Sequence, residues 1–257
     1  MKKLFSKRNK AAMLKRGKLF IGYITAGYPQ KDSFIPILKK CENEGVDIFE
    51  VGYPSLNPFA DGEIIRNAQK SVDCSIRTDI EYWKQLRSEI DGPIWVMGYS
   101  ADLIGTGNYL KIAEAGVADA FVIPDINIDE TIKLGEELSK YEIDMVYFVK
   151  NGEPELEKYF EHSSLIYYQL INGPTGSKTT QSDDFSVFLN QSKQYDDIYV
   201  FGGFGINSGE RAVKLLNSGF DGTIVGTAMI SHLNESEESL LSFISDIHSA
   251  ITESSHA

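Results

Sequence analysis

The stretch DIFEVGYPSLNPFADG, residues 47–62, contains the unit from which the chain is built. Residues 47–52 are a short apolar run, rich in β-branched and aromatic side chains, of the kind that forms a buried strand. Glu50 stands near the end of this run, and Asp61 follows in a loop that contains two prolines. A buried carboxylate is costly unless it is paired, hydrogen-bonded or used in chemistry. The purpose of Glu50 and Asp61 therefore depends on where this strand ends in the fold.

The same unit recurs along the chain, with short apolar runs at residues 19–25, 93–99, 118–124, 143–149, 163–171, 197–203 and 221–226. Helical patterns lie between the runs, at residues 32–45, 78–90, 108–116, 129–141 and 209–219, and the first has an N-cap candidate in Asp32. Such alternation is typical of a parallel sheet covered on both faces, and eight units in 257 residues predict an α/β fold of the (β/α)₈ barrel type. The alternative is an open doubly wound sheet. It would have a glycine-rich turn after the first strand, where the chain reads AGYPQKD, residues 26–32.

No linker or shift in composition divides the chain, so one domain over residues 1–257 is predicted. Residues 1–18 carry eight Lys or Arg and no long apolar run, so they are read as a short basic helix on the barrel, not as a signal peptide. Its charged face would be in solvent. Its predicted apolar face consists of Leu4, Phe5, Ala11, Ala12 and Leu14.

The formal charge of −12 argues against nucleic acid or an anionic membrane as a partner. No segment approaches the ~20 apolar residues of a membrane span. Cys41 and Cys74 form no CxxC pair, which favours reduced thiols in the cytoplasm. The four histidines lie away from the strand ends, so no metal site is expected.

In a (β/α)₈ barrel the active site lies at the C-terminal ends of the strands, where Glu50 and Asp61 fall. A structural role for Glu50, bound by a backbone amide or a lysine, is the alternative. Three later strands end in glycine-bearing turns, GPTG (173–176), GGFGI (202–206) and VGTA (225–228). Each glycine alone could serve a tight turn, but together they predict a phosphate site and a phosphorylated small-molecule substrate. Thr227 is expected to cap the helix that follows the last turn.

EVGYPSLNPFADG, INGPTG, GGFGI and VGTA, in this order, make the chain similar to the α subunit family of tryptophan synthase. The resemblance covers nearly the whole chain, including ITAGYP (24–29), VMGY (96–99) and PDINIDE (124–130). It implies a (β/α)₈ lyase that cleaves indole-3-glycerol phosphate to indole and glyceraldehyde 3-phosphate. The reaction is a retro-aldol cleavage that uses no cofactor.

The resemblance also implies roles for single residues. Glu50 matches the acid/base glutamate, and Asp61 matches an aspartate that faces the indole ring. The positions that match substrate-binding residues, including the phosphate contacts and the threonine of a mobile loop, are Tyr99, Tyr167, Thr175, Gly176, Phe204, Gly205, Gly226 and Thr227.

The chain departs from the family pattern in the loops that contact the β subunit, which carries pyridoxal phosphate. The family usually reads PFSDP where residues 54–58 stand, Gln at Arg66, and Asn-Pro after VMGY where Ser100, Ala101 and Asp102 follow. Strand six also differs, with Gln169 and Leu170 in place of an aliphatic residue and serine. The hypothesis is that docking to a standard β subunit is weakened.

Three interpretations stay open. The first is an ordinary α subunit with a co-adapted β partner. The second is a free-standing lyase, or a relative that acts on another phosphorylated substrate. The third is a catalytically idle barrel that serves as a regulatory protein partner.

Overall fold

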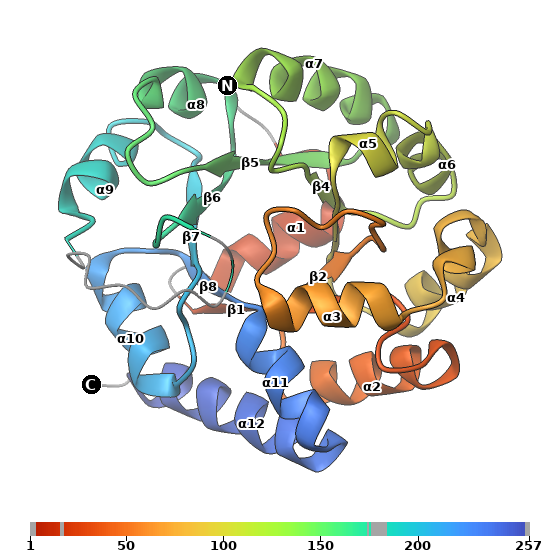
Figure 1. The fold of residues 1–257 in the computed structure, drawn as a ribbon. Helices are drawn as coiled ribbons and strands as arrows, with labels where there is room; N and C mark the ends of the chain where they lie inside the picture. Colours follow the sequence, from red (N-terminus) through yellow and green to blue (C-terminus); the bar gives the residue numbers. More distant parts are fainter. Residues whose placement is uncertain (1–3, 16–17, 174, 176–183, 255–257) are drawn as a thin grey trace.

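The computed structural model describes residues 4–15, 18–173, 175 and 184–254 (Figure 1). Within this part of the chain, eight parallel strands form a closed barrel in the order β1 to β8, and β8 pairs with β1. The predicted (β/α)₈ barrel is confirmed, and the doubly wound sheet was the wrong alternative.

Each strand lies inside one of the predicted apolar runs. The strands are β1 (Leu19–Thr25), β2 (Ile48–Gly52), β3 (Ile94–Met97), β4 (Ala120–Val122), β5 (Asp144–Val149), β6 (Leu165–Gln169), β7 (Tyr199–Gly203) and β8 (Gly222–Val225). Continuous apolar runs suit these strands because each has one face inside the barrel and the other under the helices.

The outer layer consists of α2 (Lys31–Asn43), α3 (Glu63–Ser71), α4 (Ile80–Glu89), α5 (Ser100–Leu103), α6 (Asn108–Glu114), α7 (Ile128–Leu138), α8 (Leu156–His162), α9 (Ser186–Ser192), α10 (Gly209–Ser218), α11 (Thr227–Glu235) and α12 (Glu237–Ser254), with 3₁₀ turns η2 (Cys74–Thr78) and η3 (Ser139–Tyr141). The expected cap at Asp32 is wrong. Gln30 is the N-cap of α2 and makes no side-chain cap bond, and Asp32 lies within the first turn, where its charge still favours the helix N-terminus.

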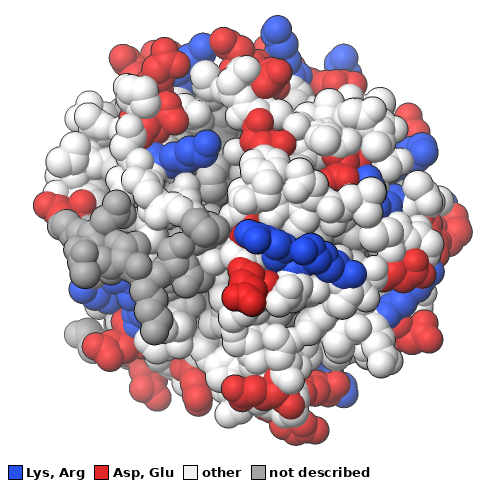
Figure 2. All heavy atoms as spheres, in the orientation of Figure 1, with Lys and Arg blue, Asp and Glu red and all other residues white. Residues whose placement is uncertain are grey.

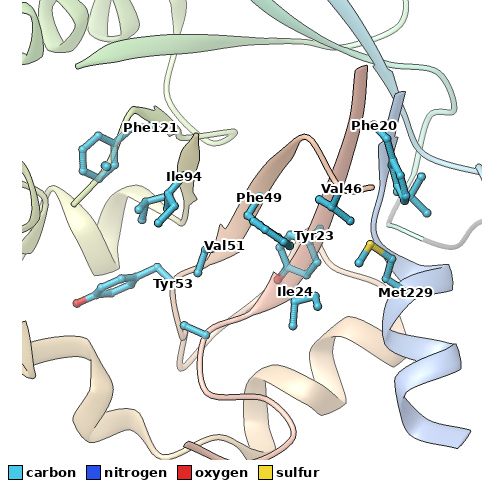
Figure 3. Packing of buried hydrophobic residues seen from close by; sticks show 14 of the residues in the cluster. Phe20, Tyr23, Ile24, Val46, Phe49, Val51, Tyr53, Ile94, Phe121 and Met229 are labelled. Atoms are coloured by element: carbon cyan, nitrogen blue, oxygen red, sulfur yellow. The ribbon is translucent and has the colours of Figure 1, made fainter. Parts of the chain in front are cut away.

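Alternation along β2 determines where its carboxylate points. Ile48 belongs to the hydrophobic cluster inside the barrel, whereas Phe49 and Val51 belong to the outer cluster under the helices. Figure 3 shows Phe49 and Val51 in this outer layer, together with Met229 of α11. Since successive side chains of a strand point to opposite faces, Glu50 faces the barrel interior.

The N-terminal segment closes the opposite end of the barrel. It forms α1 (Lys7–Ala12) and the 3₁₀ turn η1 (Met13–Lys15), and Figure 1 shows α1 across the far opening. Leu4 and Met13 join the interior cluster of the barrel. Asn9 is fully buried and accepts a hydrogen bond at its Oδ1 from the Trp95 ring nitrogen at 2.9 Å.

The predicted apolar face of this segment is therefore wrong in part. Leu14 is 85% exposed and Phe5 is 40% exposed, although Leu4 is buried as expected. A pattern of apolar residues could not identify the true inner face, because a buried asparagine with satisfied hydrogen bonds lies at its centre.

Among the described residues, no helix has the length and apolar character needed to cross a membrane.

Candidate active site

A cavity of about 1200 Å³ opens at the C-terminal ends of the strands. It brings together nine of the ten residues that the sequence selects: Glu50, Asp61, Tyr99, Tyr167, Thr175, Phe204, Gly205, Gly226 and Thr227. Gly176 lies outside the described residues. Residues from β2, β6, β7 and β8 and their loops thus meet in one place, as expected of strand ends in a barrel.

Glu50 is held at the base of this cavity with 3% of its surface exposed. Burial and, as the smaller cause, the charge of Asp61 together raise the pKa of its carboxyl to about 8. A pKa near neutrality is the property that general acid/base catalysis requires of a carboxyl group. At pH 7 Glu50 is mostly protonated and can donate its proton to a ligand.

Asp61 is also buried, with 2% exposure, but its surroundings differ. Burial raises the pKa of Asp61 to about 6, while the Tyr99 hydroxyl and the nearby Arg66 guanidinium act to lower it. The Tyr99 hydroxyl donates to Asp61 Oδ2 at 2.9 Å. Asp61 is therefore mostly ionised at pH 7, so the pair presents one proton donor and one hydrogen-bond acceptor to the cavity.

Aromatic side chains form one wall of the cavity. The ring centroid of Phe148 lies 5.1 Å from that of Tyr167 and 6.3 Å from that of Phe204, and the Tyr167 and Phe204 rings lie edge to face at 6.2 Å. On the side of the loop after β2, Phe59 and Tyr99 are in contact at 4.8 Å. These surfaces suit a flat aromatic ligand beside the two carboxylates.

The turns after β7 and β8 offer backbone N–H groups. Phe204 and Gly205 both have left-handed backbone, with φ of 79° and 77°, and a Cβ on Gly205 would come within 2.5 Å of the Ile171 side chain. Left-handed backbone at a residue other than glycine is strained, and such strain tends to occur at functional sites.

The helix α11 begins at the edge of the cavity. Gly226 is its N-cap and makes no side-chain cap bond, so the cap predicted at Thr227 is wrong, since Thr227 is the first helical residue. Within the described chain, the first N–H groups of α11 thus receive no acceptor from the capping residue. They are suited to bind an anion.

The loop after β6 contacts the loop after β2. The backbone N–H of Gly62 donates to the Thr175 hydroxyl at 2.7 Å, and a Cβ on Gly62 would lie 1.8 Å from the Thr175 carbonyl oxygen. Only glycine allows this approach, and it brings Thr175 beside the loop that carries Asp61.

The cavity contains charged and polar residues that the sequence reasoning did not assign to a site: Tyr23, Arg66, Asp125, Lys150 and Arg211. Tyr23 could have been found because it shares the inward parity of Leu19 and Ile21 on β1. Asp125 and Lys150 directly follow predicted strands, which is a usable signal in a barrel. Arg66 and Arg211 lie within helices, where only the fold shows that they reach the cavity.

The two unusual residues of β6 take different sides. Gln169 follows Tyr167 by two positions and faces inward, where its Nε2 donates to the Gly173 carbonyl oxygen at 3.0 Å. Leu170 belongs to the outer hydrophobic cluster. Gln169 is therefore the replacement that alters the inner wall and the start of the loop that carries Thr175.

No group of three or more histidine, cysteine, aspartate or glutamate side chains suited to a metal ion occurs among the described residues. The fold and the cavity together define a class of protein: a (β/α)₈-barrel enzyme with a buried carboxylate pair, an aromatic wall and, at the strand ends, turns suited to bind an anion.

Comparison with known proteins identifies the family. The model of the tryptophan synthase alpha chain family matches residues 9–254. The alpha chain of Caldicellulosiruptor saccharolyticus is 29% identical over 96% of this chain and 99% of its own length. That of Methanopyrus kandleri is 31% identical over 87% and 83% of the two chains. The chain belongs to the tryptophan synthase alpha chain family. It is accordingly a lyase of tryptophan biosynthesis, and its family implies cleavage of indole-3-glycerol phosphate.

Solved structures agree at the level of the fold. The alpha subunit from Legionella pneumophila superposes with a TM-score of 0.81 at 21% sequence identity, over 96% of this chain and 98% of that chain. A chain of tryptophan synthase from M. tuberculosis, in its aminoacrylate-bound form, gives a TM-score of 0.78 at 22% identity, over 95% and 99% of the two chains.

Proposed function

We propose that this chain cleaves indole-3-glycerol phosphate with Glu50 as the acid/base and Asp61 as the acceptor for the ring N–H. The observation that carries the assignment is the buried pair itself. Glu50 has a pKa of about 8 and Asp61 one of about 6, so the two carboxyls are in different protonation states near pH 7. The reaction needs one group of each kind.

The proposed step balances with these two residues alone. Protonated Glu50 gives its proton to C3 of the indole ring, and the ring becomes cationic. Asp61 accepts a hydrogen bond from the ring N–H and stabilises this charge. The Glu50 carboxylate then takes the proton of the hydroxyl on the adjoining carbon of the glycerol chain. The carbon–carbon bond breaks, its electron pair returns to the ring, and the hydroxyl oxygen becomes the aldehyde oxygen. Glu50 ends the cycle protonated.

The phosphate of the substrate is assigned to the turns after β7 and β8. Support comes from the left-handed backbone at Gly205 and from the N-terminus of α11 at Gly226 and Thr227, all of which line the cavity. The family resemblance adds Gly176 to this site. The indole ring is assigned to the wall of Tyr167 and Phe204, with Tyr99 beside Asp61.

A partner chain is proposed at the mouth of the cavity. Leu56 is 73% exposed, Phe59 is 59% exposed and Ile64 is 37% exposed, on the loop after β2 and the first turn of α3. Figure 2 shows many charged side chains around the outline of this face, and a band of Lys and Arg beside a group of Asp and Glu near its centre, with uncharged surface between them. Exposed apolar groups beside an active site favour a docking surface, and the family indicates a pyridoxal phosphate-dependent β chain. Exposed Asn57 in this loop supports weaker docking to a standard β chain.

The proposed location is the cytoplasm, as the biosynthetic role of the family suggests. Cys41 and Cys74 are both free thiols, which fits a reducing compartment.

The test is indole release from indole-3-glycerol phosphate by the purified chain, alone and with a tryptophan synthase β chain added. Release in either case supports the proposed reaction, and a rate raised by the β chain supports the docking surface. Absence of release in both cases, with the protein shown to be folded, would overturn the proposed function in favour of another phosphorylated substrate or an idle barrel.

A further inference from the structure

Two of the departures from the family pattern, which lie in different loops, meet in space. Ser55 in the loop after β2 donates its hydroxyl to Asp102 Oδ2 at 2.6 Å, and Asp102 lies in α5, after β3. Both side chains are enclosed, with 1% exposure for Ser55 and 9% for Asp102. A change at either position alone would lose this bond, so the two replacements form one structural unit.

Arg77 completes the unit. Its guanidinium donates to Asp102 Oδ1 at 2.7 Å, and both side chains of this ion pair are largely buried. The guanidinium also lies 5.8 Å from the centre of the Tyr53 ring, while the Tyr53 hydroxyl donates to the Arg77 carbonyl oxygen at 2.7 Å. A buried carboxylate with both oxygens hydrogen-bonded is rigidly oriented. Asp102 therefore anchors the loop after β2 through its bond to Ser55.

Both the backbone N–H and the hydroxyl of Ser55 make further hydrogen bonds. Its backbone N–H donates to Gln69 Oε1 at 2.9 Å, and its hydroxyl oxygen accepts from the N–H of Asn57 at 3.1 Å. The other end of the same Gln69 amide donates to the hydroxyl of Tyr23 at 3.1 Å, at the wall of the cavity. The start of the loop is therefore connected to the interior of the barrel as well as to α5.

The end of the loop after β2 is bound by Tyr99, at the start of α5, the same short helix that contains Asp102. Tyr99 directly precedes α5, and its hydroxyl accepts from the N–H of Ala60 at 3.2 Å while donating to Asp61. The backbone N–H of Asp102 donates to the Tyr99 carbonyl oxygen at 3.0 Å. This bond fixes the position of Asp102, which binds the start of the loop, relative to Tyr99, which binds its end. Asp125 in turn binds the N–H and hydroxyl of Ser100 at 2.9 and 2.8 Å.

We propose that Ser55, Asp102 and Arg77 are positioning residues, which order the loop of residues 54–62 and hold Asp61 in the cavity without contact with a partner chain. The inference rests on the proposed function for its catalytic consequence. The proposal concerns how the activity is regulated, because hydrogen bonds within this chain would order the loop of residues 54–62. A bound β chain is not needed to place Asp61.

The test compares Ser55→Ala with Ser192→Ala. Ser192 is a suitable control because it is also buried, at 5% exposure, and its hydroxyl donates to the Leu189 carbonyl oxygen on α9, away from the cavity. Three quantities are measured for each variant without a partner: amide hydrogen exchange of residues 54–62 in the ligand-free chain, kcat for indole-3-glycerol phosphate, and KM for the same substrate.

Ser55→Ala is expected to speed exchange in residues 54–62 and to lower kcat by about 10- to 100-fold, because misplacement of a catalytic group mainly affects the chemical step. KM should change far less, and Ser192→Ala should change none of the three. Asp102→Asn, which keeps the shape but weakens the ion pair, should move exchange and kcat in the same direction. Urea unfolding verifies that each variant is folded.

Unchanged exchange in Ser55→Ala and Asp102→Asn would overturn the proposal, as would faster exchange with unchanged kcat. An equal effect of Ser192→Ala would show a general loss of stability and would also overturn it. If the unmodified chain releases no indole, the proposed function fails, whereas the exchange result still decides whether these residues order the loop.

Discussion

The barrel has a pair of buried carboxylates at each end, and the two pairs differ in how well they are bound. Glu50 and Asp61 lie in the cavity at the C-terminal ends of the strands. Asp119 and Asp144 lie at the opposite end, under α1, and are buried to a similar degree. The same chemical group therefore occurs in two environments within one fold.

At the closed end, Asp119 has a cationic partner and several hydrogen bonds. The Arg87 guanidinium donates to it at 2.7 Å, the Ser6 hydroxyl at 2.7 Å, and the N–H of Ile94 at 3.0 Å. Asp119 is only 5% exposed, and these neighbours hold its carboxylate.

Asp144 is bound by the N-terminal segment itself. It accepts from the backbone N–H groups of Phe5 and Ser6 at 2.6 and 3.2 Å and from Asn9 Nδ2 at 2.8 Å. Burial raises the pKa of Asp144, but these hydrogen bonds act to lower it. Hydrogen bonds thus offset much of the cost of burial at this end.

At the open end, hydrogen bonds and charges offset less of the cost of burying the carboxylates. Burial and the charge of Asp61 both raise the pKa of Glu50. The hydrogen bond from Tyr99 and the charge of Arg66 lower the pKa of Asp61, yet burial still raises it to about 6. The difference teaches that burial alone does not single out a candidate catalytic carboxylate. A shortage of partners in a space that a ligand can enter does.

The largest expected effect is on turnover. Glu50→Gln should lower kcat by about 10²- to 10⁴-fold with KM nearly unchanged, because the amide keeps the shape and cannot transfer a proton. Steady-state assay of indole release measures both constants. Asp144→Asn is the matched control from the closed end and should leave kcat of the folded protein nearly unchanged. Equal losses in kcat for the two variants would remove the functional distinction between the pairs.

The next effect is on stability. Asp119→Ala should lower the free energy of unfolding by ~3–5 kcal/mol, because it leaves the buried Arg87 without its partner. Urea unfolding at pH 7 gives this quantity. The exposed Asp196 provides the control, since Asp196→Ala should change it by less than about 0.5 kcal/mol. A similar result for both variants would mean that the carboxylate at the closed end contributes little.

The third effect concerns how stability depends on pH. The pKa of Glu50 rises from 4.5 to about 8 in the folded state, so the unfolded chain releases this proton first and stability falls across that window. Glu50→Gln should therefore match the unmodified chain near pH 4. Its advantage in the free energy of unfolding should then grow up to pH 8, by a few kcal/mol. Exposed Glu114→Gln is the control, and a constant difference would contradict the raised pKa.

The smallest effect is expected from Arg66. The rate constant kcat/KM of the unmodified chain should rise with pH through about 6, as Asp61 ionises, and fall through about 8, as Glu50 loses its proton. Arg66→Gln should move the acid limb upward by about half a pH unit, because it removes a partly exposed cation that favours ionised Asp61. A pH profile of kcat/KM measures the limb. Arg66→Lys should leave it nearly in place.

Much of the fold could be predicted from the sequence, because each strand is a short apolar run that the sequence shows directly. Once eight parallel strands close into a barrel, their C-terminal ends all lie at one face. Residues 19–25 were predicted as a strand and form β1 without change, and Glu50 and Asp61 follow from their positions relative to β2. Local chemistry was less accessible. Gln30 takes an N-cap position where propensity favours other residues. Asn9 is buried because it makes hydrogen bonds to Trp95 and Asp144 that only the fold provides.

The pairing of Ser55 with Asp102 could not be predicted either. The two positions are separated by 47 residues, and each alone resembles a surface replacement in a docking loop. Their burial and mutual hydrogen bond require knowledge that the loops after β2 and β3 run side by side. The same holds for Arg66, whose reach back to the carbonyl oxygen of Asp61 at 2.6 Å depends on the entry angle of α3.

The closed end of the barrel also constrains the order in which the chain folds. The N–H of Phe5 binds the Asp144 carboxylate 139 positions later, so this contact cannot form before β5 has joined the barrel. Contacts of such sequence separation are slow to form, because closing the intervening loop costs entropy before they stabilise anything. Residues 4–15 therefore precede β1 in the sequence, yet their contacts with Asp144 can form only once β5 is in place.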